Sequence, residues 1–315
     1  MARRLQLERR HLRHAHRFSL ILAILFSPGF ARIAAAAAPA FQGTFREPIF
    51  WTPRGLALSP SGDVFVGDDS NGGYGGHLAQ FTGAGTLTDT WAFSGGTPVN
   101  PDGVAVDGSS VVFVTDPDHN RIRKYTRGFV FSSFVTAFQP VDIALNGADE
   151  VFVVALGGQQ VQKFTNGGSL LATIGSAGVG PGQFQDPQGI AVDGGGRIYV
   201  ADFTRMRILR FLASGSFDME FATPGSPADV AVGPDGNVYV VGVDMNRVYQ
   251  YSSSGALLLS FQPPDGLHGA YRIAISPTGA MYISERYYAR ITRFQIDHTT
   301  SIARTTFGRL KAMYR

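Results

Sequence analysis

Short hydrophobic runs, separated by glycine, aspartate and serine, follow one another along most of this chain. Between residues 186 and 217, β-branched and aromatic residues form runs at 190–193, 198–201 and 208–211, and a fourth run begins at Phe217. Each run is too short for a helix and ends at residues that favour tight turns. The pattern therefore predicts four antiparallel strands joined by hairpins, a sheet that cannot bury both of its faces alone.

The same pattern occurs six times. The first strands begin at residues 55, 103, 142, 189, 229 and 272, so successive starts are 48, 39, 47, 40 and 43 residues apart. Repeats of about 40 residues with four strands each are typical of β-propellers, whose innermost strands converge on an axis. An alanine stands in the middle of each first strand, as that close packing requires: Ala57, Ala105, Ala144, Ala191, Ala231 and Ala274. We therefore predict an all-β fold, a six-bladed β-propeller with four antiparallel strands per blade.

The repeat resembles the NHL repeat. Residues 187–211 contain the segments P-x-G-I-A-V-D, Y-V-A-D and R-I-x-x-F of that family, and the Gly-Pro-Gly-Gln-Phe segment at 180–184 is similar to its linker. The resemblance extends over roughly residues 41–296 and implies an NHL-type six-bladed propeller. It implies little about function, because the same propeller serves unrelated roles.

The residues before the repeats have the pattern of a secretory signal peptide, which we place at 1–38. An arginine-rich segment precedes an apolar stretch at 18–26, and alanines follow at 34–38. The stretch is short for a membrane span, which needs about 20 residues, and an uncleaved anchor is the alternative. We expect the propeller at 39–300, a short tail with helical spacing of its apolar residues at 301–315, and a secreted protein, extracellular or periplasmic.

Removal of the leader reverses the net charge. The whole chain has 27 basic and 24 acidic residues, whereas the part after Ala38 has 20 and 23, a net charge of −3. This balance argues against a nucleic-acid surface, and we expect no membrane contact beyond the signal peptide. The chain has no cysteine, but six blades bury a core large enough to fold without disulfides. We expect a monomer.

The two ends of the chain are predicted to close the ring together. Blades one to five turn from their third to their fourth strand through a glycine, whereas the corresponding segment of blade six, 296–300, has none. We therefore expect the outer strand of blade six to come from residues 41–45, which would remove open sheet edges.

Three blades depart from the repeat where the first strand begins, a position expected near the mouth of the central channel. Glycine occupies it in blades one, two and four, and Asp142, Asp229 and Arg272 replace it in the others. A charge turned into a narrow channel needs water, a partner charge or a ligand. We predict that these three form the polar floor of a ligand site; the alternative is rim charges in water.

Further polar and aromatic residues are expected on the same face. The candidate ligand-binding set is completed by Arg54, Asp102, Gln188, His119, Arg205, Arg286 and Tyr287. Exposed tyrosine and arginine on loops suit partner binding. In blades two, four and six, an acid and an arginine five residues apart are interpreted as salt bridges within the blade rather than as a charged ring.

These features favour a secreted binding or scaffold module for a protein, peptide or glycan ligand, without a cofactor. The alternative is a metal-dependent lyase or hydrolase, similar to peptide-amidating lyases or to lactonases, acting at the channel mouth. The resemblance to amidating lyases implies several channel histidines, yet the four histidines after the leader match no blade period: His77, His119, His268 and His298. A calcium site at Asp142 and Asp229 stays an alternative.

Overall fold

The computed structural model describes residues 38–46, 50–69, 76–92, 100–126, 132–136 and 138–297. The predicted signal peptide, apart from Ala38, and the predicted tail at 301–315 lie outside the described residues. No helix in the described ranges is long and apolar enough to cross a membrane.

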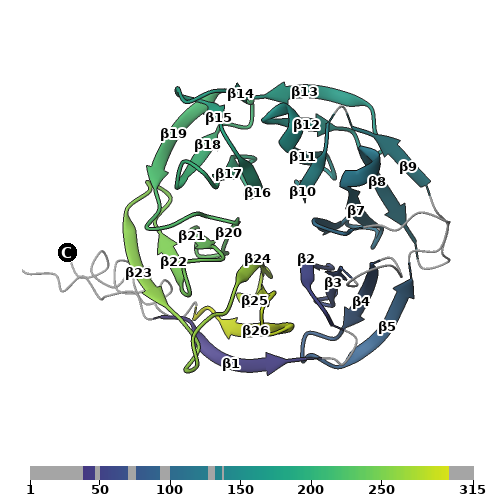
Figure 1. Ribbon diagram of the computed structural model, residues 1–315, viewed down its shortest axis with the longest axis vertical. Coiled ribbons are helices and arrows are strands. Elements are labelled where there is room, and N and C mark those ends of the chain that lie inside the picture. The colour runs from purple at the N-terminus through teal and green to yellow at the C-terminus, as the bar shows by residue number, and fades with distance from the viewer. Residues whose placement is uncertain are drawn as a thin grey trace, which may run out of the picture. The chain divides into compact units, whose positions relative to one another are not determined.

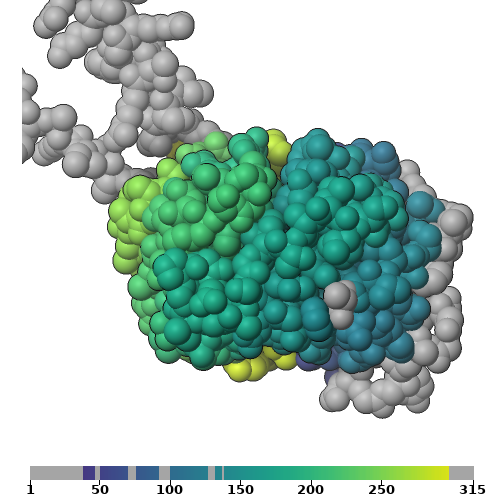
Figure 2. Space-filling model, turned by 90° about the horizontal axis from the view of Figure 1, so that it is seen from above, coloured from purple at the N-terminus to yellow at the C-terminus, as the bar shows by residue number. Residues whose placement is uncertain are grey.

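Six four-stranded antiparallel sheets surround a common axis, each with one strand at the centre and one at the periphery (Figure 1). The predicted six-bladed β-propeller is therefore confirmed. Figure 2 views the ring edge-on, where blades three and four form the side wall that faces the viewer.

The first three blades each consist of four consecutive strands, which follow one another from the axis outward. Blade one contains β2 (Pro53–Leu58), β3 (Val64–Asp68), β4 (His77–Phe81) and β5 (Leu87–Ala92). Blade two contains β6 (Val104–Val106), β7 (Val112–Asp116), β8 (Arg121–Tyr125) and β9 (Ser132–Val135). Blade three contains β10 (Pro140–Leu145), β11 (Val151–Ala155), β12 (Gln160–Phe164) and β13 (Leu170–Ile174).

The remaining blades follow after a short parallel pair formed by β14 (Ser176–Ala177) and β15 (Gln183–Phe184). Blade four contains β16 (Pro187–Val192), β17 (Ile198–Asp202), β18 (Arg207–Phe211) and β19 (Phe217–Ala222). Blade five contains β20 (Asp229–Val232), β21 (Val238–Val241), β22 (Val248–Tyr251) and β23 (Leu257–Phe261). Blade six contains β24 (Ala270–Ile275), β25 (Ala280–Glu285), β26 (Arg290–Gln295) and, outermost, β1 (Ala40–Phe45).

The pairing of β1 with β26 closes the ring. Ala40 lies opposite Gln295 and Phe45 opposite Ile291 in an antiparallel register, and Figure 1 shows β1 at the outer edge of blade six. The prediction that residues 41–45 supply this strand is confirmed.

The hydrophobic core lies between neighbouring blades. One buried cluster, for example, joins Phe65 and Trp91 of blade one to Val104 and Val112 of blade two. The second strands are buried along their whole length, as in β3 and β7. Because each sheet covers the face that its neighbour cannot bury alone, six blades stabilise one another around the ring.

All six blades share the same polarity. The connections between blades, the starts of the first strands and the loops between second and third strands lie at one end of the ring, which we call the loop face. Pro53 pairs with Asp68, and Asp68 pairs with His77, which places these three segments together in blade one. The predicted site residues therefore gather on the loop face.

Candidate functional site

The three predicted charges Asp142, Asp229 and Arg272 meet on the axis, at the loop-face end of the central channel. All three are buried, and the Arg272 side chain is only 2% exposed. Its Nε lies 3.6 Å from Oδ1 of Asp142. The alternative, that these charges lie in water at the rim of the channel, is therefore wrong, because all three side chains are buried. We call these three residues the channel floor.

Arg272 also contacts the backbones of four other blades. Its guanidinium donates to the carbonyl oxygens of Val141 at 2.8 Å, Ala228 at 3.2 Å, Gln188 at 3.3 Å and Asp102 at 3.1 Å. These residues lie at or just before the starts of the first strands of blades three, five, four and two. One side chain thus joins five blades at the axis.

The two carboxylates each bind the next blade. Oδ2 of Asp142 accepts from the backbone N–H of Ile190 at 2.9 Å, and Oδ2 of Asp229 accepts from that of Ile273 at 2.9 Å. Glycine in the preceding blade makes room for them, since a Cβ at Gly103 would lie 2.7 Å from Cα of Asp142. Packing against the aspartate of the next blade therefore requires glycine at positions 103 and 189.

Burial controls the protonation of the channel floor. It raises the pKa of Asp142, which the nearby Arg272 opposes, and raises the pKa of Asp229 well above its usual range, with the charge of Asp142 adding to the effect. Burial by itself would lower the pKa of Arg272, but the surrounding anions raise it, so the guanidinium stays charged. The prediction that this floor belongs to a ligand site stays a prediction.

A cavity of about 250 Å³ lies along the central channel. Its lining includes the middle alanine of all six first strands, among them Ala57 and Ala274, as well as the carboxylate-bearing Asp142 and Asp229. The small side chains leave this space because larger ones would collide where the strands converge.

Around the channel mouth, arginines stack on a tyrosine. The guanidinium groups of Arg272 and Arg286 lie 4.5 Å and 4.6 Å from the ring centroid of Tyr271. Nearby, Arg54 binds Asp102 at 2.7 Å and lies 3.2 Å from Asp69. Burial raises the pKa of Tyr271, so that its phenol stays protonated at neutral pH.

Three other predicted side chains do not join this group. Gln188 donates through its side chain to Asp186 at 2.6 Å. His119 contacts Asp116 in blade two at 2.8 Å. Arg205 is exposed on the β17–β18 loop.

The acid and arginine pairs lie within their blades, as interpreted from the sequence. Arg121 binds Asp116 at 2.7 Å in blade two, and Arg290 binds Glu285 at 2.9 Å in blade six. In blade four, Arg207 lies 3.2 Å from Asp202. These pairs hold the loop face together and do not form a continuous charged ring.

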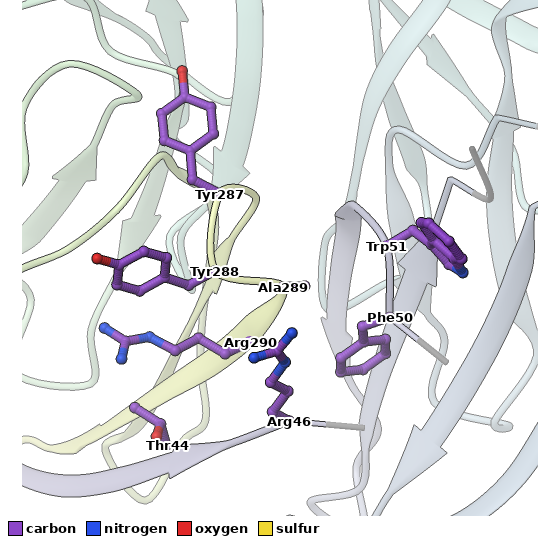
Figure 3. A pocket seen from close by; sticks show the side chains of 8 residues that line it. All are labelled: Thr44, Arg46, Phe50, Trp51, Tyr287, Tyr288, Ala289 and Arg290. Atoms are coloured by element: carbon purple, nitrogen blue, oxygen red, sulfur yellow. The ribbon is translucent and has the colours of Figure 1, made fainter. Parts of the chain in front are cut away.

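A groove of about 780 Å³ opens on the loop face where blade six meets blade one. We call it the aromatic groove; its lining residues are Thr44, Arg46, Phe50, Trp51, Tyr287, Tyr288, Ala289 and Arg290. Figure 3 shows the side chain of Arg46, the residue that follows β1, between Phe50 and Arg290. Of the predicted residues, only Tyr287 lines this groove.

Sequence reasoning missed Trp51 and Arg46 as parts of a site. Trp51 is 61% exposed, although it is one of only two tryptophans in the chain. A tryptophan two residues before the first strand of blade one, with no tryptophan at this position in the other repeats, was the signal that could have found it.

Metal-binding groups are sparse in the described part of the chain. No cluster of three or more histidine, aspartate and glutamate side chains there has the arrangement of a metal site. One oxygen of the Asp142 carboxylate lies 3.6 Å from the Arg272 guanidinium and the other accepts from the backbone N–H of Ile190, so both oxygens that a calcium ion would need already face positive groups.

Comparison with known proteins identifies the repeat and the fold. Residues 184–211 match the NHL repeat. No curated protein sequence matches significantly.

Among solved structures, the chain is similar to a streptogramin B lyase, at 13% identity and a TM-score of 0.61, covering 81% of this chain and 97% of that one. A virginiamycin B lyase from Staphylococcus aureus matches at 13% identity and a TM-score of 0.60, covering 82% and 100%. A gluconolactonase from Xanthomonas campestris matches at 14% identity and a TM-score of 0.64, covering 85% and 100%. At such identities the likeness concerns the fold alone.

Proposed function

Since this chain is a six-bladed β-propeller that contains an NHL repeat, we propose that it is an exported binding module. Its ligand is a peptide or a segment of a protein, and the aromatic groove on the loop face is the binding site. The signal-peptide pattern supports export, and the fold by itself assigns no reaction.

One observation carries this proposal: three large aromatic side chains are left in solvent beside one groove. Tyr287 is 71% exposed, Trp51 61% and Tyr288 46%. Tyrosine, tryptophan and arginine dominate the binding energy of protein interfaces, because they offer much contact area for little lost conformational freedom. An exposed cluster of this kind next to a pocket indicates a docking surface.

The groove is held in place before a ligand arrives. The Asp68 carboxylate accepts the backbone N–H groups of Trp51 and Thr52, which fixes the segment that carries the indole. Tyr288 stacks on His268 with ring centroids 3.9 Å apart, and its ring also lies 5.1 Å from the Arg290 guanidinium. Binding to such a preorganised surface costs less entropy than binding to a loose loop.

A lyase or hydrolase acting at the channel mouth is the second candidate. It is favoured by the fold shared with a streptogramin B lyase and a gluconolactonase. Against it stand the contacts of Asp142 and Asp229, whose carboxylates are engaged by Arg272 and by backbone N–H groups. Elemental analysis of protein purified without chelator separates the two candidates: stoichiometric zinc or calcium would favour the enzyme.

The binding proposal is tested with peptide and glycan arrays, using the mature protein and a Trp51→Ala, Tyr288→Ala double variant. We expect peptide hits whose affinity falls about tenfold or more in the double variant, the loss usual for aromatic contacts at the centre of an interface. Leu170→Ala, an exposed residue on β13, is the matched control and should bind like wild type. Hits that the double variant retains at full affinity, or hits confined to glycans, would overturn the proposal.

A further inference from the structure

Arg286 differs from the other arginines of the channel mouth. Arg54 binds Asp102, Arg272 lies beside Asp142, and Arg290 binds Glu285. No carboxylate among the described residues lies within ion-pair distance of Arg286, and its buried Nε has no hydrogen-bond partner there. A buried N–H without an acceptor costs free energy, which a ligand oxygen can recover.

The Arg286 guanidinium is also held in a defined position. It lies over the ring of Tyr271, 4.6 Å from the ring centroid, and the same ring also contacts Arg272 at 4.5 Å. The backbone N–H of Arg286 donates to the carbonyl oxygen of Gly269 at 3.1 Å. A stacked guanidinium presents its edge to a planar anion without first losing rotamer freedom.

Arg286 lies next to the aromatic groove. It directly precedes Tyr287 and Tyr288, and Tyr287 packs so closely on Gly269 that a Cβ there would lie 2.8 Å from the tyrosine ring. The acids nearest the mouth, Asp69 and Asp102, are already engaged by Arg54. They therefore do not neutralise Arg286, which can pair with an incoming anion.

We infer that Arg286 binds a carboxylate of the ligand, so that the groove selects a peptide carrying a free carboxyl group beside an aromatic side chain. This inference rests on the proposed binding function. In the proposed complex, the apolar part of the ligand contacts Trp51, Tyr287 and Tyr288. Its carboxylate forms a bidentate, charge-assisted pair with Arg286.

The test compares two probes that differ only in this group. N-acetyl-tyrosylphenylalanine, with a free C-terminal carboxylate, and its C-terminal amide are titrated into the mature protein by calorimetry or by ligand-observed NMR. We expect the acid to bind about tenfold more tightly than the amide, the usual advantage of a charge-assisted pair. The preference should shrink as salt is added, because the pair is only half-buried.

Two variants locate the effect. Arg286→Gln should remove the preference for the acid while the amide still binds; this ratio does not depend on the fraction of folded protein. Arg197→Gln, which changes a partly exposed arginine paired with Asp193 at a β-turn of blade four, should keep the preference.

The outcomes separate the two proposals. If the acid and the amide bind equally well and Trp51→Ala weakens the binding of both, the carboxylate site at Arg286 is overturned. The aromatic groove then still stands as the binding site. A preference for the acid that persists in Arg286→Gln would likewise overturn it. Failure of both probes to bind, or binding unaffected by Trp51→Ala, would overturn the site and the proposed function together.

Discussion

At the scale of single residues, blade one differs from blades four and six in the partner of the acid that ends its second strand. Asp202 and Glu285 end the second strands of blades four and six, and an arginine neutralises each. Blade one has Asp68 at this position, fully buried, with His77 in place of the arginine and 3.9 Å away. Burial lowers the pKa of His77, so it gives Asp68 no compensating charge at neutral pH. Burial consequently raises the pKa of Asp68 to about 6.

This difference predicts a pH dependence of stability. A carboxyl with a pKa raised on folding stabilises the fold below its unfolded value, near 4, and loses that contribution as pH rises through about 6. Asp68→Asn removes the ionisation, so its stability relative to wild type should increase by up to about 3 kcal/mol between pH 4 and pH 7.5. Urea unfolding at both pH values measures this change. Parallel pH dependences of the two proteins would show that Asp68 does not carry the effect.

At the scale of elements, the strand β1 decides how the ring is closed. It pairs with β26 over five residue pairs, and Phe45 packs on Phe81 of blade one, with centroids 5.1 Å apart. The strand therefore covers the edge of blade six and also contributes to the contact between the first and last blades.

Deletion of residues up to 46 should destabilise the whole propeller. The loss of the ladder and of the half-buried Phe45 amounts to roughly 3–5 kcal/mol. For a domain of this size, the melting temperature should fall by about 10 °C or more. A deletion that ends at residue 37 and keeps β1 is the control. Equal melting temperatures of the two truncated proteins would contradict a closing role for β1.

At the scale of the whole molecule, Arg272 is the point at which the blades meet. Its four hydrogen bonds to backbone carbonyls join blade six to blades two, three, four and five. Asp142 and Asp229 then link successive pairs of first strands. Stability of the ring therefore depends on one buried charged group as well as on the core between blades.

Arg272→Met should destabilise the protein by about 3–5 kcal/mol, because the buried Asp142 carboxylate loses its counter-charge and four backbone carbonyls lose their donor. The triple variant that adds Asp142→Asn and Asp229→Asn should recover part of this loss, since no unpaired charge then stays buried. Urea unfolding at neutral pH measures both values. A loss below about 1 kcal/mol for the single variant, or no recovery in the triple variant, would contradict this role of Arg272.

The repeat architecture could be predicted from the sequence because it depends on local signals. Alternating hydrophobic residues, turn residues and a central alanine recur in every blade, so one pattern read six times indicates the strands and their number. The closing strand was predictable for the same reason, because a missing glycine in blade six stood out against five similar blades. The convergence of Asp142, Asp229 and Arg272 followed from their equivalent repeat positions.

Only the tertiary structure decided what surrounds each of these residues. The burial and the hydrogen-bond partners of a side chain depend on how the blades meet around the axis. The sequence therefore could not show that Arg272 donates to backbone carbonyls of four other blades. The aromatic groove arises for the same reason, because Trp51 of blade one and Tyr288 of blade six become neighbours only when β1 closes the ring. The sequence by itself determined the strands, their number and the residues near the axis. Which side chains are buried and which stay exposed was decided by the contacts between blades.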